Sequence, residues 1–122
     1  MIRTGYPIIF LEGENMNVKI EVMPEVITVR LNGDIDHHTA APIREKVDSE
    51  IMKNQPSLLV LDFGGVDFMD SSGIGFVMGR YRLLKNRDAR IDIVGAAPHI
   101  EKVLRLAGLE KLANIETAER RK

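Results

Sequence analysis

Ser57-Leu58-Leu59-Val60-Leu61-Asp62-Phe63 is the stretch that decides the fold of this 122-residue chain. Its four consecutive apolar residues, 58–61, would face both sides of a sheet, which is typical of a central strand covered by helices. Gly64-Gly65 follows and predicts a loop. A helix is then predicted to begin near Ser71 or Ser72, because the apolar residues beyond them recur on one helical face. A buried strand that leads through a loop into a helix is typical of an α/β fold.

Two segments upstream of this strand alternate apolar and polar residues. Residues 17–23 and 26–31 carry an apolar side chain at every second position, which predicts two half-buried strands paired in a hairpin. Apolar residues then recur at helical spacing between residues 43 and 51. Thr39 is the predicted N-cap of that helix, and Pro42 suits its first turn.

Three more elements are predicted downstream: a short strand at residues 91–94, a helix at 98–107 and a short last strand at 113–116. The main order is therefore ββαβαβα. This order predicts an α/β fold of one domain, in which helices pack against a mixed sheet with an N-terminal hairpin. Residues 1–15 show no clear strand or helix period, so we expect them to form an N-terminal extension to a domain that spans residues 16–122.

The composition excludes several classes of protein. The chain has 17 basic and 18 acidic residues, so its charge gives no reason to expect nucleic acid or an anionic membrane as a partner. It has no cysteine, which excludes a disulfide scaffold and a thiolate zinc site. No apolar run approaches the roughly 18–20 residues that a membrane span needs. We therefore expect a cytoplasmic protein without a cofactor.

Asp67-Phe68-Met69-Asp70-Ser71-Ser72-Gly73-Ile74-Gly75 holds the most unusual residues of the chain. A serine at a helix start normally caps the helix by accepting a hydrogen bond from a backbone N–H. One serine suffices for this, so if Ser72 is the cap, Ser71 points outward. A helix N-terminus tolerates phosphate, and Asp70 would repel a phosphate on Ser71. The residues alone also allow a simpler interpretation, an ordinary turn before a capped helix.

Other chemistry fits this stretch poorly. Asp70 stands where the G-x-S-x-G motif of a hydrolase needs glycine, and Met78 stands where a dinucleotide loop needs its third glycine. Neither serine has an evident base partner, which a nucleophile requires. The three histidines, His37, His38 and His99, do not follow metal-ligand spacing. We therefore expect neither catalytic nor metal-binding residues, and the protein is predicted not to be an enzyme.

Two further features have both a structural and a functional interpretation. Gly75 and Gly79 lie four residues apart in the second predicted helix, either for close packing inside the domain or as a flat face for a partner protein. Asp34 and Asp36 precede the first predicted helix, either to complement its dipole or to meet a basic partner.

Residues 67–75 resemble the phosphorylation loop and helix start of the STAS domain family, and the order of elements agrees with that family. Residues 33–40, with their paired histidines, and residues 79–81 are similar to the anti-sigma factor antagonists of the sporulation pathway within it. The resemblance covers about residues 16–116. It implies a switch in which the unphosphorylated antagonist binds an anti-sigma factor, and the sigma factor is released. That anti-sigma factor is also an ATP-dependent serine kinase, which phosphorylates the antagonist, and a serine phosphatase reverses the reaction.

The resemblance also implies roles for single residues. Ser71 matches the phosphoacceptor. The residues that match the family's partner-binding surface are Asp34, Asp36, His37, Ser72, Ile74, Gly75 and Met78. An alternative function is a stand-alone STAS module that binds a small ligand or scaffolds a stress-signalling complex, and co-purification with the kinase would separate the two. A hydrolase that uses either serine is the least favoured function.

Overall fold

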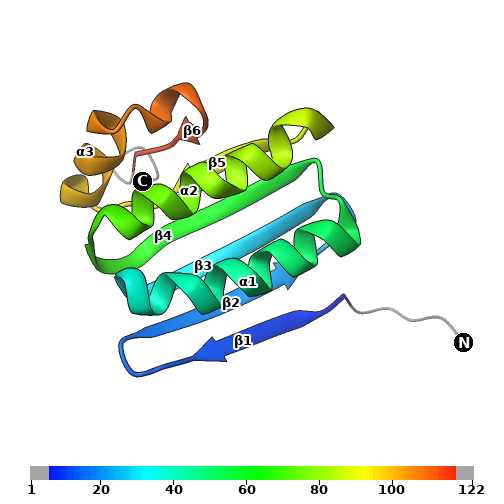
Figure 1. Ribbon diagram of the computed structural model, residues 1–122, viewed down its shortest axis with the longest axis horizontal. Helices are drawn as coiled ribbons and strands as arrows, with labels where there is room; N and C mark the ends of the chain where they lie inside the picture. Colours follow the sequence, from blue (N-terminus) through cyan, green and yellow to red (C-terminus); the bar gives the residue numbers. More distant parts are fainter. Residues whose placement is uncertain (1–5, 118–122) are drawn as a thin grey trace, which may run out of the picture.

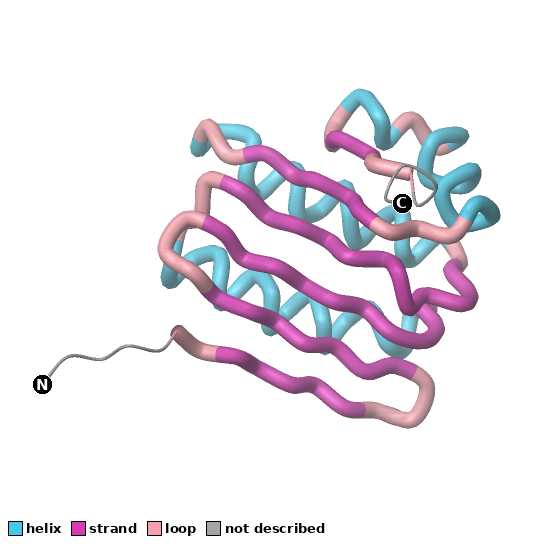
Figure 2. Tube along the Cα trace, turned by 180° about the vertical axis from the view of Figure 1, so that it is seen from behind, coloured by secondary structure: helices cyan, strands magenta, loops and turns pink. Residues whose placement is uncertain are grey.

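A six-stranded mixed sheet carries three helices on one face in the computed structural model, which describes residues 6–117 (Figures 1 and 2). The elements are β1 (Ile8–Glu12), β2 (Met16–Val22), β3 (Val26–Ile35), α1 (His37–Asn54), β4 (Leu58–Met69), α2 (Ser71–Leu84), β5 (Arg90–Val94), α3 (Pro98–Leu106) and β6 (Asn114–Ile115). The strands lie in the sheet in chain order, β1 to β6. The predicted α/β fold with an N-terminal hairpin is confirmed, with one strand added in front.

The strand directions place all three helix starts at one edge of the sheet. β1, β2 and β3 pair antiparallel, whereas β3, β4, β5 and β6 pair parallel. The parallel strands β3, β4 and β5 therefore end at the same edge, where α1, α2 and α3 begin (left in Figure 1). We call this the carboxyl edge. The turn between β1 and β2 lies there as well, because Met16 pairs with Gly33 near the end of β3. Functional residues of such sheets usually gather at this edge.

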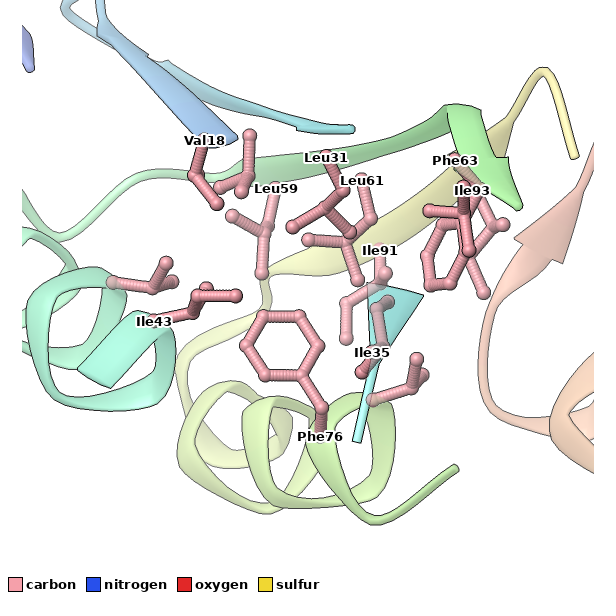
Figure 3. Packing of buried hydrophobic residues seen from close by; sticks show 14 of the residues in the cluster. Val18, Leu31, Ile35, Ile43, Leu59, Leu61, Phe63, Phe76, Ile91 and Ile93 are labelled. Carbon is pink, nitrogen blue, oxygen red and sulfur yellow. The ribbon is translucent and has the colours of Figure 1, made fainter. Parts of the chain in front are cut away.

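The core lies between the sheet and the helices. Leu59, Leu61 and Phe63 of β4 are fully buried on the helix side, and Figure 3 shows Phe76 of α2 and Ile43 of α1 pointing toward the strands. The strand is central and covered by helices as predicted, but on one face only, because all three helices lie on the same side of the sheet (Figure 2). The opposite face of the sheet is mainly polar, although Ile8 and Phe10 of β1 are exposed on it.

Ion pairs run across that polar face. Arg30 reaches Asp62 at 2.9 Å and Glu21 at 3.3 Å, and Lys19 lies 3.1 Å from Glu21. Exposed pairs of this kind add little stability. They let the uncovered face of the sheet contact water, so the domain needs a hydrophobic core on the helix side only.

The loop predicted at Gly64-Gly65 does not exist, because β4 continues to Met69. The ladder between β3 and β4 shifts register twice on the way, between Arg30 and Asn32 and between Gly33 and Asp34. Such bulges absorb extra residues and re-aim side chains without ending a strand. Gly65 is required at the first one, since a Cβ there would collide with the side chain of Asn32.

The expectation that residues 1–15 contain no strand is also wrong. β1 pairs along its whole length with residues 17–21 of β2. Its inward residues Ile9 and Leu11 pack against the core, while Phe10 points outward and is 63% exposed. The apolar run hides the alternation from the sequence, because inward and outward residues of this edge strand are both large and apolar. Residues 1–5 and 118–122 lie outside the described residues, and the domain boundary at residue 16 stays a prediction.

Candidate functional site: the start of α2 and its neighbours

Asp70, rather than Ser72, is the N-cap of α2. Its backbone is extended, and its carboxylate accepts a 2.7 Å hydrogen bond from the backbone N–H of Ser72. The interpretation in which Ser72 is the cap is therefore wrong, because Asp70, two residues earlier, takes up the free donor. Ser71 is the first helical residue and is exposed, whereas Ser72 is half-buried. Within residues 6–117, neither serine hydroxyl has a hydrogen-bond partner, so Ser71 presents a free hydroxyl.

Packing beneath the helix start fixes the position of Ser71. Met69 is buried, and a Cβ on Gly73 would collide with the Met69 side chain, so glycine lets the first turn of α2 approach the sheet. The backbone N–H of Asp70 also donates to the carbonyl of Ile35 at the end of β3. The hydroxyl of Ser71 is therefore presented from a first helical turn that is packed and hydrogen-bonded to the sheet.

The start of α1 is held by a capping box. The Asp36 carboxylate accepts from the backbone N–H groups of His38 at 2.9 Å and Thr39 at 3.0 Å, and the Thr39 hydroxyl accepts from Asp36 N–H at 2.9 Å. The prediction of Thr39 as the N-cap is therefore wrong, since the helix begins at His37. Hydrogen bonds from the backbone, first from Thr39 and then from His38, lower the pKa of Asp36. Asp36 thus carries a fixed negative charge at this edge, and Asp34 lies two residues before it.

A groove between α1 and α2 brings together part of the predicted partner-binding set. It measures about 260 Å³ and is lined by His37, Ala40, Ala41, Arg44, Ser72, Gly75 and Phe76. His37, Ser72 and Gly75 come from the predicted set, and we call this hollow the α1–α2 groove. Ile74 and Met78 instead pack partly buried against the core, and Asp34 lies on β3 opposite Phe68.

Two of the three glycines of α2, Gly75 and Gly79, face open space. A Cβ on Gly75 or Gly79 would meet no atom within 4 Å apart from its own helix backbone. The interpretation of close packing inside the domain is therefore wrong for both residues. A helix interior disfavours glycine by about 1 kcal/mol relative to alanine, and no contact of the described domain accounts for it here.

A buried ion pair joins the two helices that form the groove. The side chain of Arg80 is 4% exposed, its Nε lies 2.7 Å from Oδ1 of Asp48 on α1, and it donates to the carbonyl of Phe76 at 3.1 Å. Burial raises the pKa of Asp48 and lowers that of Arg80, because desolvation outweighs the attraction between them. The pair therefore fixes α2 relative to α1 and with it the width of the α1–α2 groove.

Phe68 is an exposed aromatic residue that the sequence did not single out as part of the site. It is 53% exposed and lies next to Asp34 in the ladder between β3 and β4. The second bulge leaves Asp67 and Phe68 exposed in succession, and the ring of His99 lies 3.1 Å from the carbonyl oxygen of Asp67. No sequence period could predict this, because the bulge breaks the alternation.

Two findings limit the chemistry of the described part of the chain. Residues 6–117 contain no cluster of three or more side chains that could hold a metal ion. None of the described helices is long and apolar enough to cross a membrane. The exposed hydroxyl of Ser71 and the α1–α2 groove remain the distinctive features of this part of the structure.

Comparison with known proteins identifies the family to which this chain is related. A family model of the STAS domain matches residues 17–121. An anti-sigma F factor antagonist from Paenibacillus polymyxa is 34% identical over 101 residues, which cover 83% of this chain and 86% of that protein. The structure of the anti-sigma factor antagonist SpoIIAA in its unphosphorylated form is 33% identical and has a TM-score of 0.73 over 84% of this chain and 90% of that one.

A second solved structure represents the modified state. The Bacillus cell fate determinant SpoIIAA in the phosphorylated form is 33% identical and has a TM-score of 0.67 over 84% of this chain and 94% of that one. The family model covers nearly the whole described chain, including the start of α2 and the α1–α2 groove. The resemblance is confirmed, and the chain belongs to the STAS domain family.

Proposed function

We propose that this protein acts in the cytoplasm as an anti-sigma factor antagonist. In its unmodified form it binds an anti-sigma factor, and the sigma factor held by that protein is released. The observation that carries the proposal is the exposed hydroxyl of Ser71 at the first residue of α2, in a chain whose relatives are named as anti-sigma factor antagonists. The chain acts as a binding partner and a phosphorylation substrate, not as an enzyme.

Phosphorylation of Ser71 turns the antagonist off. The anti-sigma factor is also the serine kinase, and it supplies ATP, magnesium and the catalytic base. Oγ of Ser71 attacks the γ-phosphorus, the bond to the β–γ bridging oxygen breaks, ADP leaves, and the serine proton passes to the base. A serine phosphatase hydrolyses the phosphoserine and restores the binding form. Ser72 is the poorer acceptor because it is half-buried in the α1–α2 groove.

The partner binds over the carboxyl edge and the exposed side of α2. The proposed contact residues are Asp34, Asp36, His37, Ser72, Ile74, Gly75 and Met78. Gly75 supports this surface, since its lack of a side chain lets a foreign backbone approach α2 closely. Phe68 extends the same surface with an exposed aromatic ring, and aromatic residues are frequent among those that dominate binding energy.

Kinase labelling tests the proposal. The purified chain is incubated with its cognate anti-sigma factor and magnesium ATP, and the phosphate is mapped by mass spectrometry. We expect one phosphate on Ser71, no labelling of Ser71→Ala, and normal labelling of the matched control Ser72→Ala. Modification mainly at Ser72 would overturn the site assignment. Absence of both binding and labelling with the anti-sigma factor would overturn the function.

A further inference from the structure

A second cavity lies at the carboxyl edge, between the β1–β2 turn and the start of α1. It measures about 420 Å³, and we call it the hairpin cavity. Its apolar lining includes Leu11, Val18, Pro42 and Ile43. In Figure 1 the turn and the start of α1 lie side by side at the left. The cavity depends on β1, since the turn closes it on one side.

The rim of the hairpin cavity is acidic. Glu12 and Glu14 of the turn are exposed, and Asp36 adds a third carboxylate. No lysine or arginine lines the cavity, and His38 is its one imidazole. Within residues 6–117, neither glutamate takes part in an ion pair. An apolar floor under unpaired carboxylates disfavours phosphate and other anions as occupants.

The same charge extends along the carboxyl edge beyond the cavity. Asp34, Asp67 and Asp70 also lack an ion-pair partner among the described residues. A chain with a net charge of only −1 thus concentrates carboxylates where the partner is proposed to bind. Charge complementarity therefore requires a basic surface on whatever covers this edge.

We propose that the hairpin cavity receives a lysine or arginine side chain of the anti-sigma factor, so that the β1–β2 turn is part of the partner interface. This inference rests on the proposed function. A long basic side chain has an apolar stem and a charged end. The stem packs on Leu11, Val18 and Ile43, and the charged end lies between the carboxylates of Glu12 and Glu14. The turn thereby contributes to the choice of partner.

Charge-neutral variants of the rim test the inference. Glu12→Gln/Glu14→Gln removes two charges, and the control Glu45→Gln/Glu116→Gln removes two charges from exposed glutamates that do not line the cavity. Binding to the unphosphorylated chain is measured by calorimetry at low and high salt, after circular dichroism has shown that each variant is folded. We expect about tenfold weaker binding for the rim variant at low salt, a smaller difference at high salt, and less than a twofold change for the control.

A charge reversal and a partner mutation make the test specific. Glu14→Arg should weaken binding about a hundredfold, and one Lys→Ala or Arg→Ala change in the anti-sigma factor should remove most of the effect of Glu14→Gln in a double-mutant cycle. Equal affinities of the rim and control variants would overturn the inference while the proposed function stands. Failure of the wild-type chain to bind the anti-sigma factor would instead overturn the proposed function.

Discussion

Asp36 and Asp70 do the same work at two helix starts, and this leaves other side chains free for a partner. Each aspartate precedes its helix, and in the first turn Asp36 accepts hydrogen bonds from two backbone N–H groups and Asp70 from one. Because the carboxylates satisfy these donors, the hydroxyl of Ser71 and the ring of His37 are not needed as caps. Both side chains are exposed at the carboxyl edge. Capping by aspartate is therefore what makes the serine at the helix start available.

The lowered pKa of Asp36 predicts an acid-dependent loss of stability. Hydrogen bonds from Thr39 and His38 place its folded pKa below the unfolded value of about 4. The stabilisation is fully present above the unfolded pKa and is lost as the pH falls through the folded one. Asp36→Asn keeps a capping oxygen without the titration. Its urea midpoint should therefore fall less steeply than that of the wild type between about pH 5 and pH 2, and parallel curves would contradict this.

The ion pair between Asp48 and Arg80 predicts strong coupling of two mutations. Asp48→Ala leaves the buried guanidinium unpaired and should lower the free energy of unfolding by about 2 kcal/mol, less than for a fully buried pair because Asp48 is 33% exposed. Arg80→Met alone should also destabilise, but the double variant should cost less than the sum of the two. Urea unfolding of all four proteins measures this coupling. Additive effects would show that the pair does not hold α1 and α2 together.

At the scale of the elements, glycine in the interior of α2 lowers the stability of that helix. Gly75→Ala should raise the free energy of unfolding by about 0.5–1 kcal/mol, because alanine is the better helix former and its Cβ would enter open space. The same change should weaken binding to the anti-sigma factor by at least tenfold, since the Cβ occupies the space of the partner's backbone. Thermal unfolding and calorimetry give the two values.

Gly79→Ala is the matched comparison for this prediction. It lies one turn further along α2, also with open space around its Cα, and should stabilise the fold equally. A smaller loss of affinity than for Gly75→Ala would place the centre of the interface near the helix start. If Gly75→Ala stabilised the chain and left binding unchanged, Gly75 would not belong to the interface.

β1 is predicted to be an addition to a domain that folds without it. The fully buried core begins at Met16, and Ile9 and Leu11 are only partly buried. A chain that starts at Met16 should keep one cooperative thermal transition, with a midpoint lowered by less than about 8 °C, which is about 1–2 kcal/mol for a domain of this size. A larger drop would show that β1 is integral to the core. Because the hairpin cavity is lost, this chain should also bind the anti-sigma factor more weakly.

Period and turn chemistry made most elements predictable from the sequence, and the failures have local causes. Gly64-Gly65 is ambiguous because glycine marks both loops and bulges, and only pairing with β3 distinguishes them. The sequence does not predict β1, because the outward residues Ile8 and Phe10 are as apolar as the inward residues Ile9 and Leu11. The prediction of Thr39 as the N-cap fails because the sequence does not show where helical backbone begins.

The residues of the site also fall into those that the sequence predicts and those that it does not. The position of Ser71 at a helix start is predictable because two adjacent serines stand before a helical period, and α2 begins at this residue. Its role as phosphoacceptor stays a prediction. Phe68 depends on a bulge, and the pairing of Arg80 with Asp48 joins residues 32 positions apart. Such contacts are set by tertiary packing, which no local pattern encodes.

At the scale of the whole molecule, the residues of the proposed switch share one edge and one rigid support. The carboxyl edge holds the starts of all three helices and the β1–β2 turn, over a continuous core. The structures of SpoIIAA in its unphosphorylated and phosphorylated forms both match this chain over 84% of its length. SpoIIAA therefore keeps a fold similar to that of this chain in both of its states.

The last prediction is that phosphorylation of Ser71 blocks binding without refolding the chain. The phosphate adds about two negative charges at the start of α2, beside Asp70, whose carboxylate already occupies the Ser72 N–H. The helix dipole still tolerates the new charge, so the fold has no reason to change. Binding is weakened instead, because a partner surface shaped for a hydroxyl must desolvate a dianion. A penalty of about 3 kcal/mol weakens binding more than a hundredfold.

Two measurements on the same samples decide between a surface block and a conformational switch. Amide chemical shifts should change only at residues 70–75, close to the modified side chain, and affinity for the anti-sigma factor should fall for the phosphorylated chain. Ser71→Asp should reproduce part of the loss, because it carries one charge and no tetrahedral oxygens, whereas Ser71→Asn should bind almost as the wild type does. Shift changes that spread through β5 and α3, away from the modified side chain, would indicate a conformational switch. Equal affinity of the two forms would show that the added charge does not reach the interface, and Ser71 would then lie outside it.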